Sequence, residues 1–153
     1  MTKKVLTTQE VLDLIPQKHP FCFVDEILEV DDHHIVGQYR FHPDDFFYTG
    51  HFPGSPITPG VILIEAMAQV GVVAFGIYLL SKDLDAEDIN KYITLFSDVQ
   101  AEFFLPVYPG DLIICRAEKI FWRQKKLRCK VDAHNADGKL VASCVASGIG
   151  VAK

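Results

Sequence analysis

The sequence contains little that would tie it to disulfides or to a metal. Its four cysteines form no CxxC pair and stand at no metal-ligand spacing from a histidine; they are Cys22, Cys115, Cys129 and Cys144. Each lies in an apolar or alternating run, so we predict reduced thiols in the core of a cytoplasmic protein. Disulfides or a metal centre are the alternatives, and we expect no metal.

Positive charge is also scarce. The chain has 15 lysines and arginines against 20 aspartates and glutamates, for a formal net charge of −5. Phosphate binding needs a concentrated basic face, so this balance argues against nucleic acid as a partner. A hydrophobic fraction of 49% beside a charged fraction of 23% predicts a soluble globular protein.

Targeting, linker and membrane signals are missing as well. The residues Met1–Leu6 are followed at once by polar positions, which is not typical of a signal peptide. The longest apolar run, Val61–Leu80, is interrupted by Glu65 and Gln69, which favours a buried helix over a membrane span. With no repeat or low-complexity tract in 153 residues, we expect one domain over 1–153.

The apolar pattern predicts both helices and strands. A short helix is expected from Thr7 or Thr8 to about Leu14, and a long one over Val61–Leu80, apolar almost all round and therefore enclosed. Six runs rich in apolar and β-branched residues are predicted strands: 21–30, 35–41, 92–105, 111–122, 127–135 and 139–151. We predict a two-residue hairpin turn at Asp137-Gly138 and a mobile connection over Ser81–Lys91.

This order of elements implies an α+β architecture. Strands joined mostly by hairpins, with one long buried helix between the second and third, predict a curved antiparallel sheet of about six strands wrapped around that helix. Such a sheet leaves one helix flank and one sheet edge uncovered. A second copy would cover both, so we expect at least a dimer.

The chemistry of the chain is concentrated where a proline-rich loop runs into the long helix. Prolines and glycines restrict the loop that carries His51, and an imidazole is a natural general base. After Pro59, the backbone N–H groups of Gly60 and Val61 open the helix without intrahelical partners. These donors, at the positive end of the helix dipole, suit the stabilisation of an oxyanion.

One carboxyl group lies about a turn farther into this helix. Glu65 has apolar neighbours, and burial raises the pKa of an unpaired carboxyl, which suits a general acid. Gln69, four residues on, shares its helix face and is placed to orient Glu65. A histidine in such a loop is usually structural, but its conjunction with a helix N-terminus and a buried carboxyl favours function. The remaining histidines are interpreted as surface or turn residues: His19, His33, His34, His42 and His134.

These residues resemble the (3R)-hydroxyacyl-[acyl-carrier-protein] dehydratases of hot-dog fold, in the branch that only dehydrates. The resemblance covers nearly the whole chain and is carried by residues 14–21 (LIPQKHPF), Val24-Asp25, 50–60 (GHFPGSPITPG), 65–69 (EAMAQ) and 106–111 (PVYPGD). It implies removal of water from a (3R)-3-hydroxyacyl thioester to give a trans-2-enoyl thioester, in fatty-acid or related lipid synthesis.

The resemblance also implies roles for single residues. His51 and Glu65 would be the catalytic pair, contributed by different subunits of a homodimer, and the Gly60 amide would polarise the thioester carbonyl. Phe52 and Pro59 would support this site, and Tyr92 lies near the position of a tunnel-gating aromatic. No cofactor is implied, because the substrate is carried on the phosphopantetheine of an acyl carrier protein. Dimer and trimer of dimers both remain open.

Two features depart from the family pattern. Glu102-Phe103-Phe104-Leu105 and Glu26 stand where basic residues that help to dock an acidic carrier protein are common. A basic cluster at 123–130 is an alternative docking face, or a solvated hairpin tip; it comprises Arg123, Lys125, Lys126, Arg128 and Lys130. Two other functions are therefore kept open: a hot-dog thioesterase, and a partner subunit of a hetero-oligomeric dehydratase.

Overall fold

The apolar run after the proline-rich loop forms the helix around which the chain is arranged. In the computed structural model, which describes residues 5–153, this helix consists of α2 (Gly60–Ala68), a π-helical stretch (Gln69–Ala74) and α3 (Phe75–Leu80). It begins one residue before the predicted start and ends where predicted. Residues 1–4, on which the expected lack of a signal peptide partly rests, lie outside the described residues.

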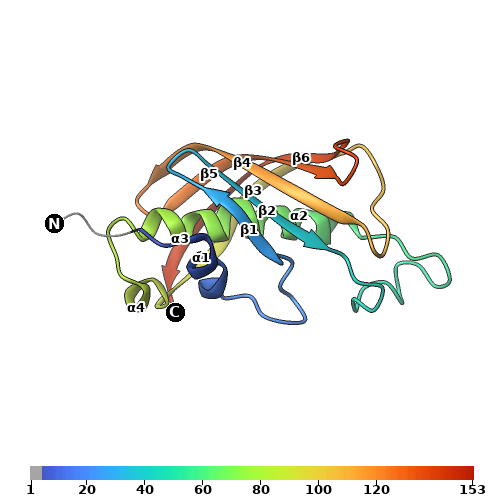
Figure 1. The fold of residues 1–153 in the computed structure, drawn as a ribbon, viewed down its shortest axis with the longest axis horizontal. Helices are drawn as coiled ribbons and strands as arrows, with labels where there is room; N and C mark the ends of the chain where they lie inside the picture. The colour runs from blue at the N-terminus through green and yellow to red at the C-terminus, as the bar shows by residue number, and fades with distance from the viewer. Residues whose placement is uncertain (1–4) are drawn as a thin grey trace.

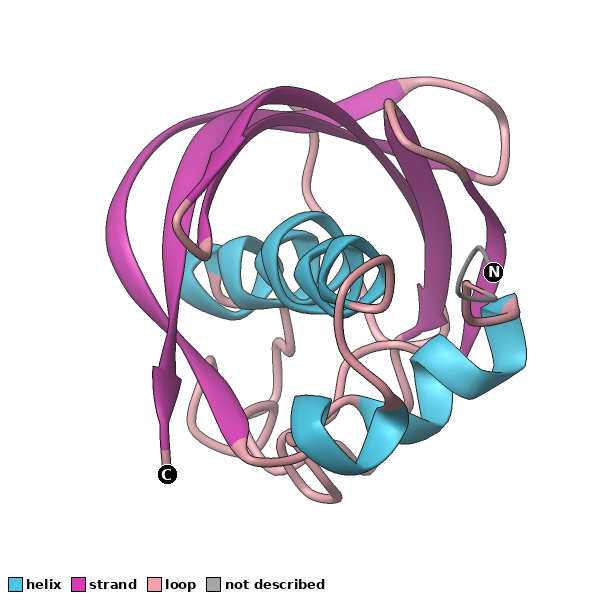
Figure 2. Cartoon of the chain, turned by 90° about the vertical axis from the view of Figure 1, so that its left-hand side faces the viewer, coloured by secondary structure: helices cyan, strands magenta, loops and turns pink. Residues whose placement is uncertain are grey.

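Six antiparallel strands form one sheet with the order β1-β2-β4-β5-β6-β3. Their bounds are β1 Glu26–Val30, β2 His34–Arg40, β3 Tyr92–Phe103, β4 Leu112–Arg123, β5 Lys126–Asn135 and β6 Leu140–Ala152. The sheet curves over the long helix, as Figures 1 and 2 show from two sides. The predicted α+β arrangement is confirmed.

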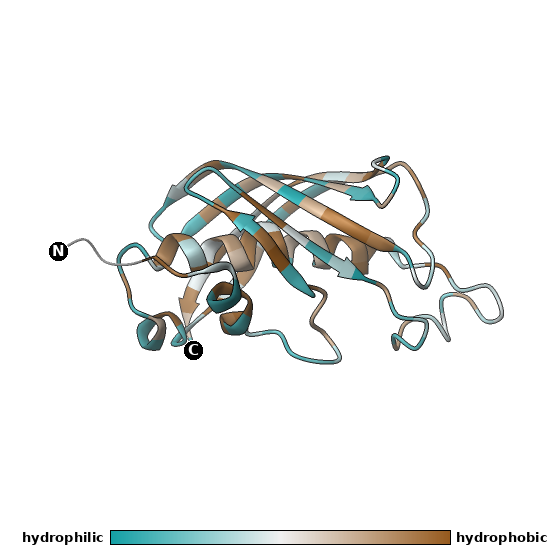
Figure 3. Ribbon diagram, viewed as in Figure 1, coloured by the Kyte–Doolittle hydropathy of each residue, from teal (hydrophilic) through white to brown (hydrophobic). Residues whose placement is uncertain are grey.

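The helix packs very close to the sheet because a glycine faces the central strands. A Cβ atom at Gly71 would lie 2.6 Å from Cγ2 of Val131 on β5, closer than side chains approach one another. Apolar side chains fill the remaining space. In Figure 3 the ribbon of the long helix carries mostly the hydrophobic colour. The Gly60–Leu80 helix is long and apolar enough to cross a membrane, but 78% of its most apolar 18-residue window is buried inside the protein. It is the core helix of this fold.

Two short helices pack outside this core. Helix α1 (Thr8–Leu14) begins with a capping box, in which the Thr7 side chain accepts from the Glu10 N–H and the Glu10 side chain accepts from the Thr7 N–H. Helix α4 (Ala86–Ile89) lies inside the stretch that was predicted as a mobile connection, so that prediction is wrong. Its Ile89 is buried and anchors the connection to the core.

The first predicted strand is shorter than expected, because Phe21–Asp25 is not in the sheet. There the backbone bonds a helix side chain: the Phe23 N–H donates to Oε1 of Gln69 (2.7 Å), and the Phe21 carbonyl accepts from Nε2 of Gln69 (3.0 Å). Phe23 itself is fully buried. An apolar run can satisfy its backbone this way, and sequence pattern alone does not distinguish it from a strand.

The predicted two-residue turn at Asp137-Gly138 is a three-residue loop. The Asn135 N–H donates to the Lys139 carbonyl (2.9 Å), and the Asn135 side chain accepts from the Asp137 and Lys139 N–H groups (3.0 Å each). Gly138 takes φ +82°, the left-handed position that such loops require. The other strands agree with their predicted ranges to within two residues.

Strand β3 is an edge strand with an unusually apolar surface. Among the strands of residues 5–153 it pairs only with β6, and most of its 12 residues are exposed. Exposed apolar side chains occur along its whole length: Leu95, Phe96, Val99 and Phe103. An unpaired apolar edge of this length favours pairing with a further chain.

Candidate functional site

The loop before α2 holds the His51 ring in a defined orientation. Its Nδ1 lies 2.9 Å from the Ile57 carbonyl oxygen. A carbonyl oxygen only accepts, so Nδ1 carries the proton and Nε2 keeps a free lone pair in the neutral ring. The ring also stacks on Phe52, with centroids 4.1 Å apart. Phe52, which was predicted to support the site, therefore contacts the His51 ring directly.

Beside His51, the N-terminus of α2 presents uncapped backbone donors. The first helical bonds run from the Ile62 and Leu63 N–H groups to the Pro59 carbonyl (3.0 and 3.1 Å), and no side chain caps this turn. The Gly60 and Val61 N–H groups precede those bonds and point out of the helix start. They carry the positive end of the helix dipole, where anionic oxygen is stabilised.

A side chain at the first helical position would crowd a neighbouring aromatic ring. A Cβ atom on Gly60 would lie 3.0 Å from Cζ of Phe103, whose ring covers the helix start. Together with His51, these two residues line an open pocket of about 840 Å³. Phe103 was considered only as a departure from the family pattern, and nothing in its sequence context places it over Gly60.

Glu65 is half-buried and bonded as the sequence predicted. Nε2 of Gln69 donates to Oε2 of Glu65 (2.9 Å). Gln69 cannot turn its amide around, because its Oε1 must accept from the Phe23 N–H. Burial raises the pKa of Glu65 above its ordinary value of 4.5, and the Gln69 hydrogen bond opposes this only in part. Because Gln69 donates to Oε2, the proton of protonated Glu65 lies on the other oxygen, Oε1.

His51 and Glu65 line different pockets within one chain. The Glu65 pocket also contains Gln17, Thr94 and Phe96, and it shares no lining residue with the His51 pocket. Gln17 was not expected at the site. The loop around His51 and the helix around Glu65 are thus as the sequence predicted. Within a single chain, however, the two side chains do not share a pocket.

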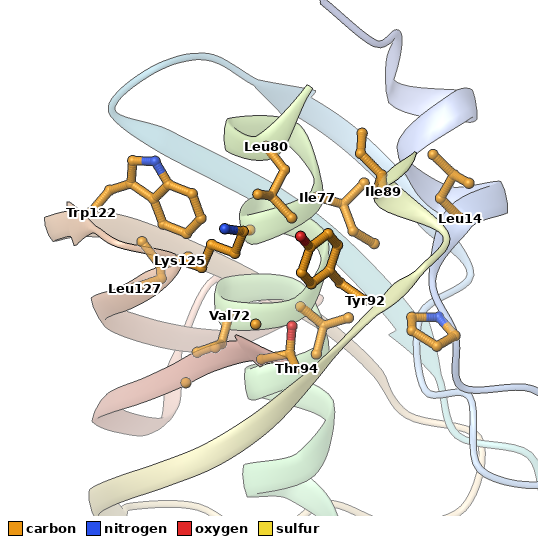
Figure 4. A pocket seen from close by; sticks show the side chains of 15 residues that line it. Leu14, Val72, Ile77, Leu80, Ile89, Tyr92, Thr94, Trp122, Lys125 and Leu127 are labelled. Carbon is orange, nitrogen blue, oxygen red and sulfur yellow. The ribbon is translucent and has the colours of Figure 1, made fainter. Parts of the chain in front are cut away.

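An apolar cavity continues from Glu65 along the long helix. Val72, Val73 and Thr94 line both the Glu65 pocket and a second, narrow pocket toward the helix C-terminus. Figure 4 shows Tyr92 on one side of this second pocket and Lys125 opposite it, with Lys125 Nζ 5.2 Å from the centre of the Tyr92 ring. Tyr92 thus lies beyond Glu65 in the cavity.

The basic cluster is divided among several local contacts. Arg128 donates to Asp98 (3.1 Å) and to Ser147 (3.0 Å), and Lys130 pairs with Asp132 (3.5 Å). Lys125 lines the cavity near the C-terminal end of the long helix, whereas His51 lies near its N-terminal end. The hairpin tip is therefore remote from the histidine.

The remaining histidines and cysteines show no sign of a reactive centre. His34 and His134 are half-buried in strands and not in turns, while His19, His33 and His42 are exposed. All four cysteines are free. Burial raises the pKa of Cys115 and Cys129 to about 12 and that of Cys144 to about 11, which suppresses thiolate formation. Within residues 5–153, no three His, Cys, Asp or Glu side chains are placed to hold a metal ion together.

Comparison with known proteins gives consistent matches. The model of the FabA-like domain matches residues 15–145. The chain is 38% identical over 138 residues to the 3-hydroxyacyl-[acyl-carrier-protein] dehydratase FabZ of Hydrogenobaculum sp., covering 89% of this chain and 88% of that one. The FabZ of Caulobacter vibrioides is 36% identical, with 91% and 88% covered.

Solved structures show the same fold at low sequence identity. The dehydratase heterocomplex ApeI:P from Xenorhabdus doucetiae matches with a TM-score of 0.76 and 14% identity, covering 97% of this chain and 93% of that one. A thioesterase from Haemophilus influenzae matches with a TM-score of 0.67 and 17% identity, with 99% and 94% covered. The predicted hot-dog fold is thereby confirmed.

Proposed function

Because the chain belongs to the FabA-like domain family, we propose that it is a hydro-lyase that converts (3R)-3-hydroxyacyl-[acyl-carrier-protein] into the trans-2-enoyl form. The observation that carries this proposal is the shared pocket of His51 and the uncapped start of α2. It offers a base and an oxyanion site side by side, as removal of a proton next to a thioester carbonyl requires.

In the first half of the reaction, Nε2 of His51 takes a proton from C2 of the substrate. The bond between Nδ1 and the Ile57 carbonyl fixes this tautomer and stabilises the imidazolium that forms. Negative charge develops on the thioester oxygen, and the Gly60 N–H at the helix start donates to it.

In the second half, Glu65 assists departure of the C3 hydroxyl. The electrons of the C2–H bond form the double bond, the C3–O bond breaks, and the oxygen takes the Glu65 proton from Oε1 to leave as water. A raised pKa keeps this proton available, and Gln69 holds the carboxyl from its other oxygen. The proton on His51 returns to Glu65 through solvent, which completes the cycle without an organic cofactor or a metal.

The complete site needs two chains. Within one chain the two groups line separate pockets, and the exposed apolar edge of β3 lies beside both, through Phe103 in one and Phe96 in the other. Pairing of two β3 edges in a homodimer would cover these side chains. His51 of one protomer then meets Glu65 of the other. Further assembly into a trimer of dimers is compatible with this arrangement.

The cavity beyond Glu65 suits the acyl tail. Its walls are mostly apolar, and from Glu65 to Ile77 the helix it follows rises roughly 18 Å at about 1.5 Å per residue. Tyr92 and Lys125 narrow it at the far end, so they are placed to influence the length of tail that is accepted. The thioester and its phosphopantetheine arm would lie toward His51.

The protein is a single hot-dog domain that acts in the cytoplasm. It takes its substrate from acyl carrier protein during fatty-acid synthesis. Four free thiols, three of them buried, are compatible with a reducing compartment. The exposed apolar residues Phe104 and Leu105, at the mouth of the His51 pocket, make this rim the docking face closest to the reacting group.

An assay of the purified protein tests this function. Incubation with a crotonyl thioester should consume the enoyl absorbance as the hydrated product forms, with no release of free thiol. Free thiol without hydration would instead indicate a thioesterase. Absence of both signals with carrier-bound substrate would contradict any catalytic function of the isolated protein.

A further inference from the structure

One buried polar atom in the Glu65 pocket has no hydrogen-bond partner. It is Oε1 of Gln17, in the segment between α1 and β1, and it is the only buried side-chain nitrogen or oxygen among residues 5–153 that is left in this state. Leaving such an atom unpaired destabilises the fold. Buried polar atoms normally have partners, so this oxygen is an acceptor that a ligand in the pocket can use.

The protein cannot supply the missing donor by a small rearrangement of Gln69. Its two amide hydrogens already bond the Phe21 carbonyl (3.0 Å) and Oε2 of Glu65 (2.9 Å), and its Oε1 accepts from the Phe23 N–H. The rest of the pocket wall is largely apolar, with Ala68 and Val72 among its side chains. Gln69 therefore has no hydrogen left for Gln17, and a substrate hydroxyl that enters this pocket can supply the donor.

We propose that Gln17 binds the hydroxyl group that leaves in the dehydration, an inference that rests on the proposed function. The C3 hydroxyl donates its hydrogen to Oε1 of Gln17, and its oxygen takes the proton of Glu65. When the C3–O bond breaks, that oxygen leaves with the bonding electron pair and both hydrogens as water. Gln17 itself undergoes no covalent change.

This arrangement has a consequence for stereochemistry. Two groups on the same pocket, Glu65 as donor and Gln17 as acceptor, fix the direction of the C3–O bond relative to the acyl tail. A (3S)-hydroxyl group cannot face both while the tail follows the same cavity. Gln17 is thus a specificity-determining residue for the (3R) substrate.

The test compares Gln17→Met with Gln9→Met. Methionine has nearly the length of glutamine but no carbonyl acceptor, and Gln9 is an exposed glutamine of α1 that controls for the substitution itself. In Gln17→Met we expect kcat/KM for a (3R)-3-hydroxyacyl thioester to fall about tenfold to a hundredfold. Inhibition by the saturated acyl thioester, which has no hydroxyl, should change by less than about twofold. Gln9→Met should alter neither quantity.

Two outcomes would overturn the proposal. If Gln17→Met weakened binding of the hydroxylated and the saturated thioester equally, Gln17 would be a structural residue. If kcat/KM were unchanged, Gln17 would not bind the substrate hydroxyl. Calorimetry in the Glu65→Gln background, where turnover is blocked, separates this question from the proposed function. If the preference for the 3-hydroxyacyl over the saturated thioester disappears with Gln17→Met, the hydroxyl site stands even should the wild type prove inactive as a dehydratase.

Discussion

At the scale of single residues, hydrogen bonds determine which atoms of His51 and Glu65 carry a proton. The Ile57 carbonyl selects the tautomer of His51, and Gln69 decides which oxygen of Glu65 carries the proton. Neither decision needs a charged neighbour. An imidazole and a carboxyl group are thereby held in defined orientations by neutral groups alone.

Removal of either group should abolish most of the activity. His51→Ala and Glu65→Gln are each expected to lower kcat by about a hundredfold or more, the usual contribution of one positioned acid or base. Steady-state hydration of a crotonyl thioester measures this. His42→Ala, at an exposed histidine outside the pocket, is the control. A near-normal rate in either site variant would contradict the role assigned to that residue.

The raised pKa of Glu65 also makes a prediction about stability. A carboxyl that holds its proton more tightly in the folded than in the unfolded chain stabilises the fold fully below its ordinary pKa of 4.5. That contribution is lost as pH rises from this value to the raised folded pKa. Glu65→Gln has no such proton. The Tm of Glu65→Gln minus that of wild type should therefore increase as pH rises from 4.5 to the raised folded pKa of Glu65, and stay constant above it. Thermal unfolding between about pH 4 and about pH 8 measures it; a constant difference would argue against the raised pKa.

At the scale of elements, the long helix serves as both core and active-site wall. Its Gly60 start lies in the His51 pocket, Glu65 follows about one turn later, and the π-helical stretch begins at Gln69. Such irregular turns are frequent at functional sites. Close packing against β5 holds this whole element, and therefore the site, in place.

Two glycines of this helix should respond oppositely to substitution. Gly71→Val would force a side chain against Val131 and is expected to destabilise the fold by about 1–3 kcal/mol. Gly76→Ala meets no atom within 4 Å and should stabilise it by up to about 1 kcal/mol through helix propensity. Urea unfolding gives both values. Similar effects of the two substitutions would show that the helix does not pack on β5 as described.

At the scale of the whole molecule, one edge strand of the sheet has a surface that favours contact with a second chain. The β3 edge is exposed and apolar, while each chain divides its acid and base between two pockets. Both features have the same explanation if two chains pair along β3. Function is then a property of the dimer and is lost on dissociation.

A charge on this edge should separate the chains. Val99→Lys places an ammonium group at the middle of β3, and we expect a monomer with at least about tenfold lower activity. Leu28→Lys is the matched control, since Leu28 is 42% and Val99 41% exposed, and Leu28 lies on the opposite edge strand β1. Sedimentation equilibrium and the hydration assay report the two effects. A Val99→Lys protein that stays dimeric would place the interface elsewhere.

Mixing two inactive variants tests whether the site is shared. His51→Ala and Glu65→Gln chains, unfolded together and refolded, should regain about a quarter of wild-type activity, because half of the dimers are mixed and each mixed dimer keeps one of its two sites. The same mixture without unfolding is the control. If both groups came from one chain, no mixing would restore activity.

Sequence patterns by themselves determined the class of fold and the local setting of the candidate site residues. The periodicity of apolar residues sets which runs become strands, and the enclosed helix follows from its apolar composition. The residue types of His51, Gly60, Glu65 and Gln69, and their spacing along one loop and one helix, are local properties. They need no knowledge of distant contacts, so the sequence predicts them well.

Only the tertiary structure decided the contacts between segments far apart in the chain. It removed Phe21–Asp25 from the sheet by bonding that backbone to Gln69, laid Phe103 over Gly60, and placed Gln17 in the Glu65 pocket. It also divided His51 and Glu65 between two pockets. Each of these outcomes depends on how the curved sheet and the helix pack together, and packing geometry is not encoded in the periodicity of any one segment.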